Sequence, residues 1–281
     1  MTFGQILVLA IVQGFGELLP VSSSAHVIVA EKLMGLDPTT PEMTMLLVML
    51  HTGTMLAVLA YFWRAWRARW FGSRTAFMSF ARLVVIATAA TGVVGLALLV
   101  LIQRVVLRGA VHHDVEDLFG NVYIIATGLA AAGILIIVSA RRARHALTRD
   151  LDPRRAASIG IVQGLCLPFR GFSRSGATIS TGLIAGIDRA TAEDFSFALA
   201  VVLTPPVIAR EAWRLLRAQH GAQAPASLLH LAGPGLTGMV LSLVAGLVAL
   251  RWLSRWLERG RWHLFGFYCL AASLALFWFV R

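Results

Sequence analysis

The chain has 281 residues, of which 58% are hydrophobic and 14% are charged, and its mean hydropathy is +0.75. A soluble domain has about 25% charged residues and cannot bury an apolar surplus of this size, so a soluble globular protein and a disordered one are both excluded. The net charge of +11 comes mainly from arginines that lie between apolar segments. This arrangement is typical of membrane topology rather than of nucleic-acid binding, so we expect an all-α polytopic membrane protein with no nucleic-acid partner.

The first element, residues 3–33, is apolar but is interrupted by a polar segment that contains glycine and proline. Each of its two apolar runs would reach ~20 Å as a helix, which is too short to cross a bilayer core of ~30 Å. Irregular backbone at membrane depth is tolerated only where it is buried in protein or lines a cavity. We therefore interpret residues 3–33 as a re-entrant hairpin of two short helices.

Three spans follow this hairpin, and the same order then repeats after a second interrupted segment, residues 156–187. That segment has the character of the first and predicts a second re-entrant hairpin. A Thr-Ala-Glu-Asp pattern at 191–194 is typical of a capping box at the start of the next helix. The six predicted transmembrane helices comprise residues 42–63, 83–103, 119–140, 192–213, 231–251 and 263–280.

The arginines are distributed unevenly among the predicted loops. Most of them lie in loops 64–82, 141–155 and 251–261, and the segments at the opposite face of the membrane carry fewer. Loops rich in lysine and arginine stay on the cytoplasmic side. The three loops are therefore predicted to be cytoplasmic, which places both termini outside the cytoplasm.

A short sequence repeat relates the two halves of the chain. Ile-Val-Gln-Gly at 11–14 recurs at 161–164, and the same offset places Ser23 on Ser173. Each half reads as a hairpin followed by three spans, and because three is odd, the second half must be inverted relative to the first. We predict an inverted-topology repeat, 1–150 and 151–281, within one membrane domain. Inverted repeats place binding sites at their interface near the midplane, so the two polar breaks are expected to meet there.

The first break carries side chains that suit catalysis. Gln13 and Glu17 lie four residues apart and so share one face of a helix. A carboxylate inside the membrane is costly and indicates a function, although a polar network that only pins the hairpin would also account for it. Ser23 and His26 follow at a spacing of three, which favours a nucleophile and base acting near Glu17.

The second break places Arg174 among hydroxyl groups at the expected start of a helix. A guanidinium offers two parallel donors to phosphate, and a helix N-terminus adds free N–H groups and positive partial charge. This constellation predicts an anionic phosphate ligand. The alternative is an internal pair between Arg174 and Glu17 that holds the repeats together. The candidate phosphate-binding residues are Ser22, Arg170, Ser173, Arg174, Ser175 and Thr178.

At these residues the chain resembles the undecaprenyl-diphosphate phosphatase family of bacterial inner membranes, the bacitracin-resistance type. The family's first motif is a Glu or Gln, three residues, Glu, then Pro-Val-Ser-Ser and a His, and residues 13–26 match it. Its second motif, Pro-Gly-x-Ser-Arg-Ser with a downstream Thr, is matched by residues 170–178. There are three departures: Gln13 stands where many members have Glu, Ala25 replaces the usual glycine before the His, and Arg170 stands in place of the usual proline.

The resemblance implies hydrolysis of undecaprenyl diphosphate to undecaprenyl phosphate, which recycles the lipid carrier of peptidoglycan synthesis and confers bacitracin resistance. It implies a divalent cation, Mg²⁺ or Ca²⁺, held by Glu17 and Gln13. Glu17, Ser23, His26 and Arg174 are then the catalytic residues. Ser23 attacks the terminal phosphorus or positions the water that does, His26 is the base, and Arg174 neutralises the phosphate. The implied location is the bacterial inner membrane, with the active site open to the extracytoplasmic side. The protein could be a monomer or a homodimer.

Other functional classes stay open for this sequence. An inverted repeat is also a transporter architecture, so the chain could instead flip a lipid phosphate. An intramembrane serine protease would use Ser23 and His26, but Arg174 and Glu17 have no evident role in cleaving a peptide bond. Phosphate release in detergent separates a phosphatase from a pure flippase.

Overall fold

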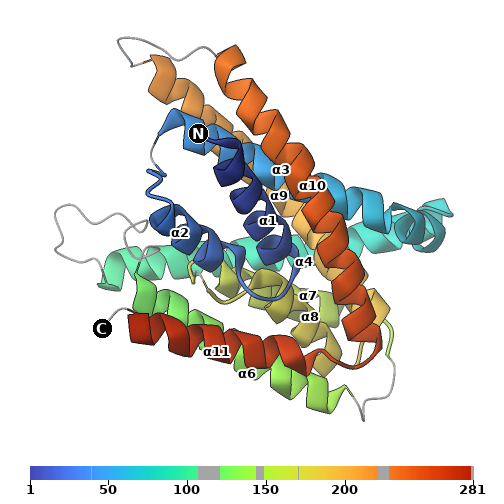
Figure 1. Ribbon diagram of the computed structural model, residues 1–281. Helices are drawn as coiled ribbons and strands as arrows, with labels where there is room; N and C mark the ends of the chain where they lie inside the picture. Colours follow the sequence, from blue (N-terminus) through green and yellow to red (C-terminus); the bar gives the residue numbers. More distant parts are fainter. Residues whose placement is uncertain (39, 107–120, 144–148, 170, 221–227, 280–281) are drawn as a thin grey trace. The chain divides into compact units, whose positions relative to one another are not determined.

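The computed structural model describes residues 1–38, 40–106, 121–143, 149–169, 171–220 and 228–279. Within these ranges the regular elements are helices, and the only β-type pairing is an isolated bridge between Arg149 and Ile187. The described residues therefore confirm the predicted all-α class, and Figure 1 shows the helices coloured in chain order.

Both interrupted segments form pairs of short helices that pack against each other. The longest of the four helices has 16 residues, so it reaches ~24 Å and is shorter than a bilayer core. The lengths agree with the predicted hairpins, and their re-entrant placement in a membrane stays a prediction. The pairs are α1 (Phe3–Leu18) with α2 (Ser23–Leu33), and α7 (Pro153–Cys166) with α8 (Arg174–Ile184).

Five helices among the described residues are long and apolar enough to cross a membrane. The sixth predicted span, 263–280, corresponds to α11 (His263–Phe279), which has 17 residues and is shorter than the ~20 that a span usually needs. Five spans are thus supported by length and composition. They are α3 (Pro41–Arg69), α4 (Arg74–Leu101, continued by the π-helix η1, Ile102–Val106), α6 (Val122–Arg142), α9 (Arg189–His220) and α10 (Leu228–Glu258).

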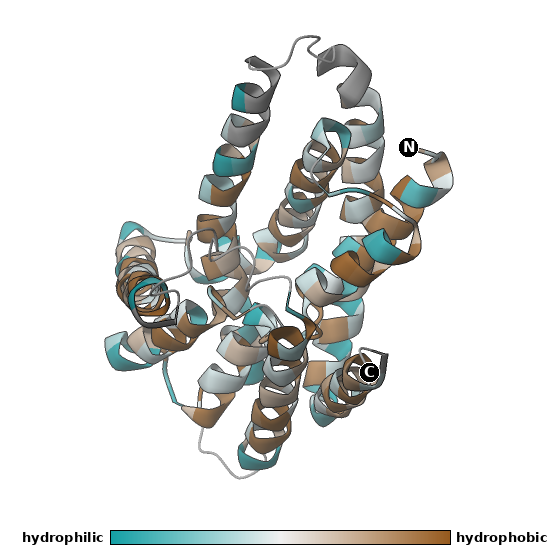
Figure 2. Ribbon diagram, turned by 90° about the vertical axis from the view of Figure 1, so that its left-hand side faces the viewer, coloured by the Kyte–Doolittle hydropathy of each residue, from teal (hydrophilic) through white to brown (hydrophobic). Residues whose placement is uncertain are grey.

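Apolar side chains lie on the outside of these helices. Val240, Val244 and Val248 of α10 are each about half exposed, and their spacing of four places them on one helix face. Val93 of α4 is 69% exposed. Figure 2 shows hydrophobic residues along the helices. Exposed apolar faces of this kind need a lipid environment, so the chain is a multi-pass membrane protein.

Contacts group the chain into two compact units, and α3, α9 and α10 each contribute residues to both. Unit 1 comprises Met1–Leu19, Ser23–Arg64 and Ala200–Leu253. Unit 2 comprises Pro20–Ser22, Ala65–Leu199 and Ser254–Arg281. The two units are defined by which residues contact one another, whereas the predicted repeats, 1–150 and 151–281, are defined by matching sequence. The units therefore do not test the repeats, which stay a prediction.

The core of unit 1 lies among α1, α2 and α3. Leu9, Leu46 and Leu50 have no exposed surface and form one apolar cluster. A buried hydrogen bond adds α10 to this core, because Ser242 Oγ donates to the Leu50 carbonyl at 3.0 Å. This packing holds the first hairpin against two of the spans.

Unit 2 holds α7 tightly against α4. Gly160 is needed at this crossing, because the backbone of Ala87 occupies the space that a Cβ would fill. Thr91 Oγ1 donates to the Gly160 carbonyl at 2.9 Å and accepts from Gln163 Nε2 at 3.1 Å. A buried bond from Ser273 Oγ to the Ala126 carbonyl, 2.6 Å long, joins α11 to α6 in the same unit. The second hairpin therefore packs against α4 through α7 and against α6 through α8.

The capping box predicted at 191–194 is wrong. Helix α9 already begins at Arg189, and Asp188 Oδ1 accepts from the backbone N–H of Thr191 at 2.9 Å. Asp194, the acidic residue of the expected box, is buried and accepts from Arg69 Nη1 at 3.0 Å. Asp188 is a better N-cap than Thr191 and precedes it, so the acidic residue expected to complete the box is used in tertiary packing instead.

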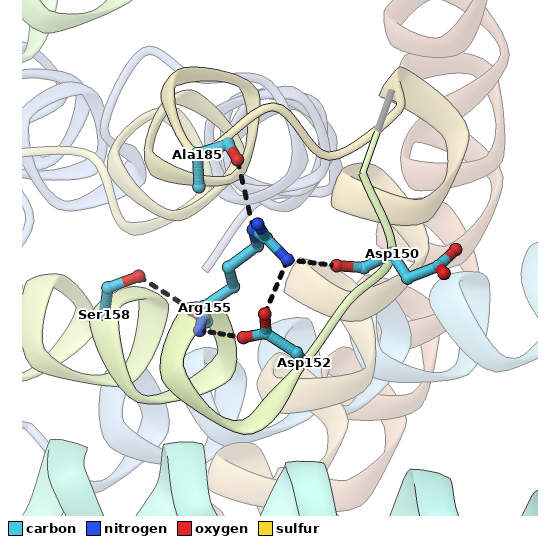
Figure 3. A network of polar contacts seen from close by, with 5 residues as sticks. All are labelled: Asp150, Asp152, Arg155, Ser158 and Ala185. Atoms are coloured by element: carbon cyan, nitrogen blue, oxygen red, sulfur yellow. Dashed lines mark hydrogen bonds and ion pairs between the residues drawn. The ribbon is translucent and has the colours of Figure 1, made fainter. Parts of the chain in front are cut away.

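Arg155 ties the beginning of the second hairpin to its end (Figure 3). Asp152 caps α7 by accepting from the Arg155 backbone N–H at 2.8 Å, and its other oxygen accepts from Arg155 Nη1 at 2.6 Å. The same guanidinium donates to the carbonyls of Asp150, at 2.8 Å, and of Ala185 after α8, at 3.2 Å. These contacts lower the pKa of Asp152, chiefly through the hydrogen bond from the Arg155 backbone.

We expect Asp152→Ala to lower the unfolding temperature in detergent at pH 7. A carboxylate whose pKa is lowered on folding stabilises the fold above the ordinary aspartate pKa, ~3.9, and this contribution is lost as the pH falls through the lowered value. The difference between parent and variant should therefore shrink below pH ~4. Asp150→Ala is the matched control, since Asp150 contacts Arg155 through its carbonyl. A gap that stayed constant from pH 7 to pH 3 would contradict this account.

Candidate functional site

Ser23 and Glu17 meet within unit 1. Ser23 is the first residue of α2, and its Oγ donates to Glu17 Oε2 at 2.6 Å. Gly16 allows this approach, because a Cβ at that position would lie 2.8 Å from the Cα of Ser23. A short bond to a charged carboxylate is among the stronger hydrogen bonds in proteins. Glu17 therefore orients the Ser23 hydroxyl.

His26 and Gln13 flank this pair. His26 is half-buried on α2, and its spacing of three from Ser23 places both on one helix face. Gln13 is 1% exposed, one helical turn before Glu17, and among the described residues no group accepts a hydrogen bond from its Nε2. A buried amide with an unused donor has bonding capacity left for a ligand.

In the second hairpin the break is shaped by two residues with positive φ. Gly171 has a φ of +100°, which glycine adopts without strain, and it packs against the backbone of Ile125. Ser173, with a φ of 42°, caps α8 by accepting from the Gly176 N–H at 3.3 Å. Arg174 is the first residue of α8 and is half-buried, whereas Arg170 lies outside the described residues.

The other predicted phosphate-binding hydroxyls of α8 are buried. Ser175 is 2% exposed and Thr178 has no exposed surface. Thr178 Oγ1 donates to the Arg174 carbonyl at 2.8 Å and lies 2.6 Å from Ser196 Oγ of α9. Ser196 is absent from the sequence-predicted site. A single serine in an apolar helix gives no signal, because its hydroxyl is usually satisfied by the preceding turn.

The turn of the first hairpin lies beside α8 within unit 2. The Pro20 carbonyl accepts from Cys269 Sγ at 3.1 Å, and a Cβ on Gly176 would lie 3.1 Å from the Pro20 Cβ. Ser22, the last residue of this turn, is 6% exposed and directly precedes Ser23. The turn between the helices of the first hairpin is thus a neighbour of the helix whose first residue is Arg174.

The two breaks share one backbone feature. Ser22 and Ser173 are the non-glycine residues with positive φ in the described chain, and each directly precedes a helix. In both hairpins the second short helix therefore begins directly after a serine with left-handed backbone.

The model of the family described as "Bacitracin resistance protein BacA" matches residues 6–275 of the chain. The chain belongs to the BacA family. Similar proteins include Undecaprenyl-diphosphatase 2 of Acinetobacter baylyi, which is 57% identical over 270 residues that cover 95% of this chain and 94% of the relative. The Undecaprenyl-diphosphatase of Gluconobacter oxydans is 33% identical over 284 residues, covering 98% and 97%. Undecaprenyl-diphosphatase 1 of Burkholderia pseudomallei is 36% identical over 296 residues, covering 98% and 96%.

The match to the BacA family includes both hairpins, and the relatives cover nearly the whole chain. Membership confirms the family suggested by the two sequence motifs.

Proposed function

We propose that this BacA-family chain hydrolyses undecaprenyl diphosphate to undecaprenyl phosphate and phosphate, and so recycles the lipid carrier of peptidoglycan synthesis. The observation that carries the proposal is 57% identity, across 95% of the chain, to a relative named Undecaprenyl-diphosphatase 2. Bacitracin resistance follows from the family description. Release of one phosphate per lipid by the purified protein tests the proposal.

The second hairpin supplies the phosphate-binding part of the proposed site. Arg174 offers a bidentate fork to the terminal phosphate, and the N-terminus of α8 adds backbone N–H groups and positive partial charge. Ser173, Ser175 and Ser22 are further candidate contacts around this turn. The predicted inverted repeat, which places binding sites at the repeat interface, supports the idea that residues of both breaks act on one diphosphate.

The first hairpin supplies the reactive groups. Ser23 Oγ forms a bond to the terminal phosphorus while the bond from that phosphorus to the bridging oxygen breaks, and undecaprenyl phosphate leaves. Water then releases phosphate from the serine; in the alternative, Ser23 positions a water that attacks directly. His26 takes the proton of the attacking oxygen, and Glu17 holds the Ser23 hydroxyl in place through their 2.6 Å bond.

The residues of the first hairpin fit a hard divalent cation, Mg²⁺ or Ca²⁺. Such ions prefer oxygen ligands, and Mg²⁺ is usually held by one or two carboxylates together with substrate phosphates and water. Glu17 offers a carboxylate, and the amide of the buried Gln13, one helical turn before it, offers a carbonyl oxygen. A bound cation would neutralise charge on the diphosphate.

The proposed location is the bacterial inner membrane. We propose six transmembrane helices and two re-entrant hairpins arranged as an inverted repeat, with α11 as the sixth span. Both termini and the opening of the active site face the extracytoplasmic side. The excess of arginine in loops 64–82, 141–155 and 251–261 supports this orientation.

Cysteine labelling of intact cells tests the orientation. A membrane-impermeant thiol reagent should modify Asp37→Cys, between α2 and α3, and should leave Ser73→Cys and Ala146→Cys unlabelled until the membrane is permeabilised. The parent chain, with Cys166 and Cys269, gives the background. Labelling of both Ser73→Cys and Ala146→Cys in intact cells would refute the orientation.

A further inference from the structure

A chain of buried hydroxyls connects α9 to the backbone of Arg174. Thr178 Oγ1 donates to the Arg174 carbonyl at 2.8 Å. Ser196 Oγ lies 2.6 Å from Thr178 Oγ1. Either hydroxyl can be the donor in this pair. In the arrangement in which Thr178 donates its one proton to the Arg174 carbonyl, Ser196 donates to Thr178. The hydrogen bonds thus run from Ser196 through Thr178 to the first residue of α8.

The two hydroxyl groups are shielded from water, and the helix that carries Ser196 is firmly packed. Ser196 and Thr178 have no exposed surface, so no water competes for their hydrogen bonds. Ser196 lies between Phe195 and Phe197, which are also fully buried, and the ring of Phe195 packs edge-on against Phe80 of α4. Close packing of this kind holds α9 in one position at Ser196. The hydroxyl chain transmits that position to the first turn of α8.

We infer that Ser196 is a positioning residue for Arg174, acting through Thr178; the inference rests on the proposed function. Bidentate recognition of phosphate requires the guanidinium to be placed accurately, and a displacement of ~1 Å in a catalytic group can cost ~10²-fold in rate. In this account the Thr178 hydroxyl holds the helix that carries Arg174 and does not contact the substrate.

Ser180, on the same helix, provides a matched control. Its hydroxyl has no exposed surface and accepts from Ser139 Oγ at 3.0 Å and from Trp262 Nε1 at 3.2 Å. These bonds fasten α8 to α6 and to the residue before α11, about half a turn beyond Thr178. Loss of this hydroxyl should reduce stability without moving the first turn of α8.

The test measures kcat/KM for undecaprenyl diphosphate in Ser196→Ala and Ser180→Ala, each alone and combined with Arg174→Lys. Ser196→Ala should lower kcat/KM by about tenfold, the upper end for one buried hydrogen bond. Its combination with Arg174→Lys should cost less than the product of the two losses, because both disturb the same bidentate contact. For Ser180→Ala combined with Arg174→Lys, the loss in kcat/KM should equal the product of the two single losses, because the two sites act independently.

A second variant separates positioning from folding. Thr178→Val with Ser196→Ala removes both partners and leaves no buried hydroxyl unpaired, so the unfolding temperature should approach that of the parent. Its kcat/KM should stay about tenfold low, because the hydroxyls that position Arg174 are absent. Parent-like kcat/KM in the double variant, or multiplicative losses for Ser196→Ala with Arg174→Lys, would overturn the inference alone. An inactive parent chain would overturn the proposed function and this inference with it.

Discussion

Replacing Arg174 by alanine should lower turnover by ~10²–10³-fold or more, by analogy with removal of one oxyanion donor. Arg174 begins α8, beside the turn that precedes Ser23. Under the proposed function, its charge would stabilise the phosphoryl group most where negative charge develops in the transition state. Measurement of kcat for purified, folded Arg174→Ala with undecaprenyl diphosphate checks the expectation.

Arg174→Lys separates charge from geometry, since lysine keeps the charge and loses the fork. It should recover only a minor part of the lost rate, and full recovery would exclude bidentate recognition. Arg155→Ala is a matched control, because Arg155 ties the ends of the same hairpin and should affect stability far more than kcat. If Arg174→Ala failed to accumulate and Glu17→Ala in the same chain restored it, an internal ion pair would be the better account.

Glu17→Gln should abolish turnover, with a loss of about 10²-fold or more, comparable to the loss of one electrostatic contact in an active site. Glutamine can still accept the hydrogen bond from Ser23, so the substitution removes the charge and keeps the contact. Titration with Mg²⁺ and Ca²⁺ should show weaker cation activation. Gln13→Glu, which adds a carboxylate one turn away, should keep or raise activity. A parent-like rate and cation dependence in Glu17→Gln would refute the metal assignment.

Apolar runs and their interruptions predicted the helices well, but the ends of those helices less well. Helix α3 was expected to stop at residue 63 and continues to Arg69, and α10 was expected to stop at 251 and continues to Glu258. A hydropathy pattern marks the end of a span where charged residues begin. The helix itself can continue past that point, because long arginine side chains keep their charged ends in water while the backbone stays helical. The start of α9 shifted for a different local reason, the cap provided by Asp188.

The composition of the candidate site could be predicted, whereas its connections could not. Ser23 and His26, three residues apart, predict a nucleophile and base near Glu17, and the 2.6 Å hydrogen bond from Ser23 to Glu17 agrees with that expectation. No local pattern indicates that Ser196 reaches Thr178 or that Trp262 reaches Ser180. Such contacts depend on how separate helices pack, which the period of a helix does not encode.

The central claim is that both hairpins serve the hydrolysis of a lipid diphosphate. The most direct test is phosphate release from undecaprenyl diphosphate by the purified chain in detergent, with and without a chelator of divalent cations. We predict one phosphate per lipid, loss of release with chelator, and recovery when Mg²⁺ or Ca²⁺ is restored. A folded chain that binds the lipid but releases no phosphate under any of these conditions would contradict the account and favour a flippase.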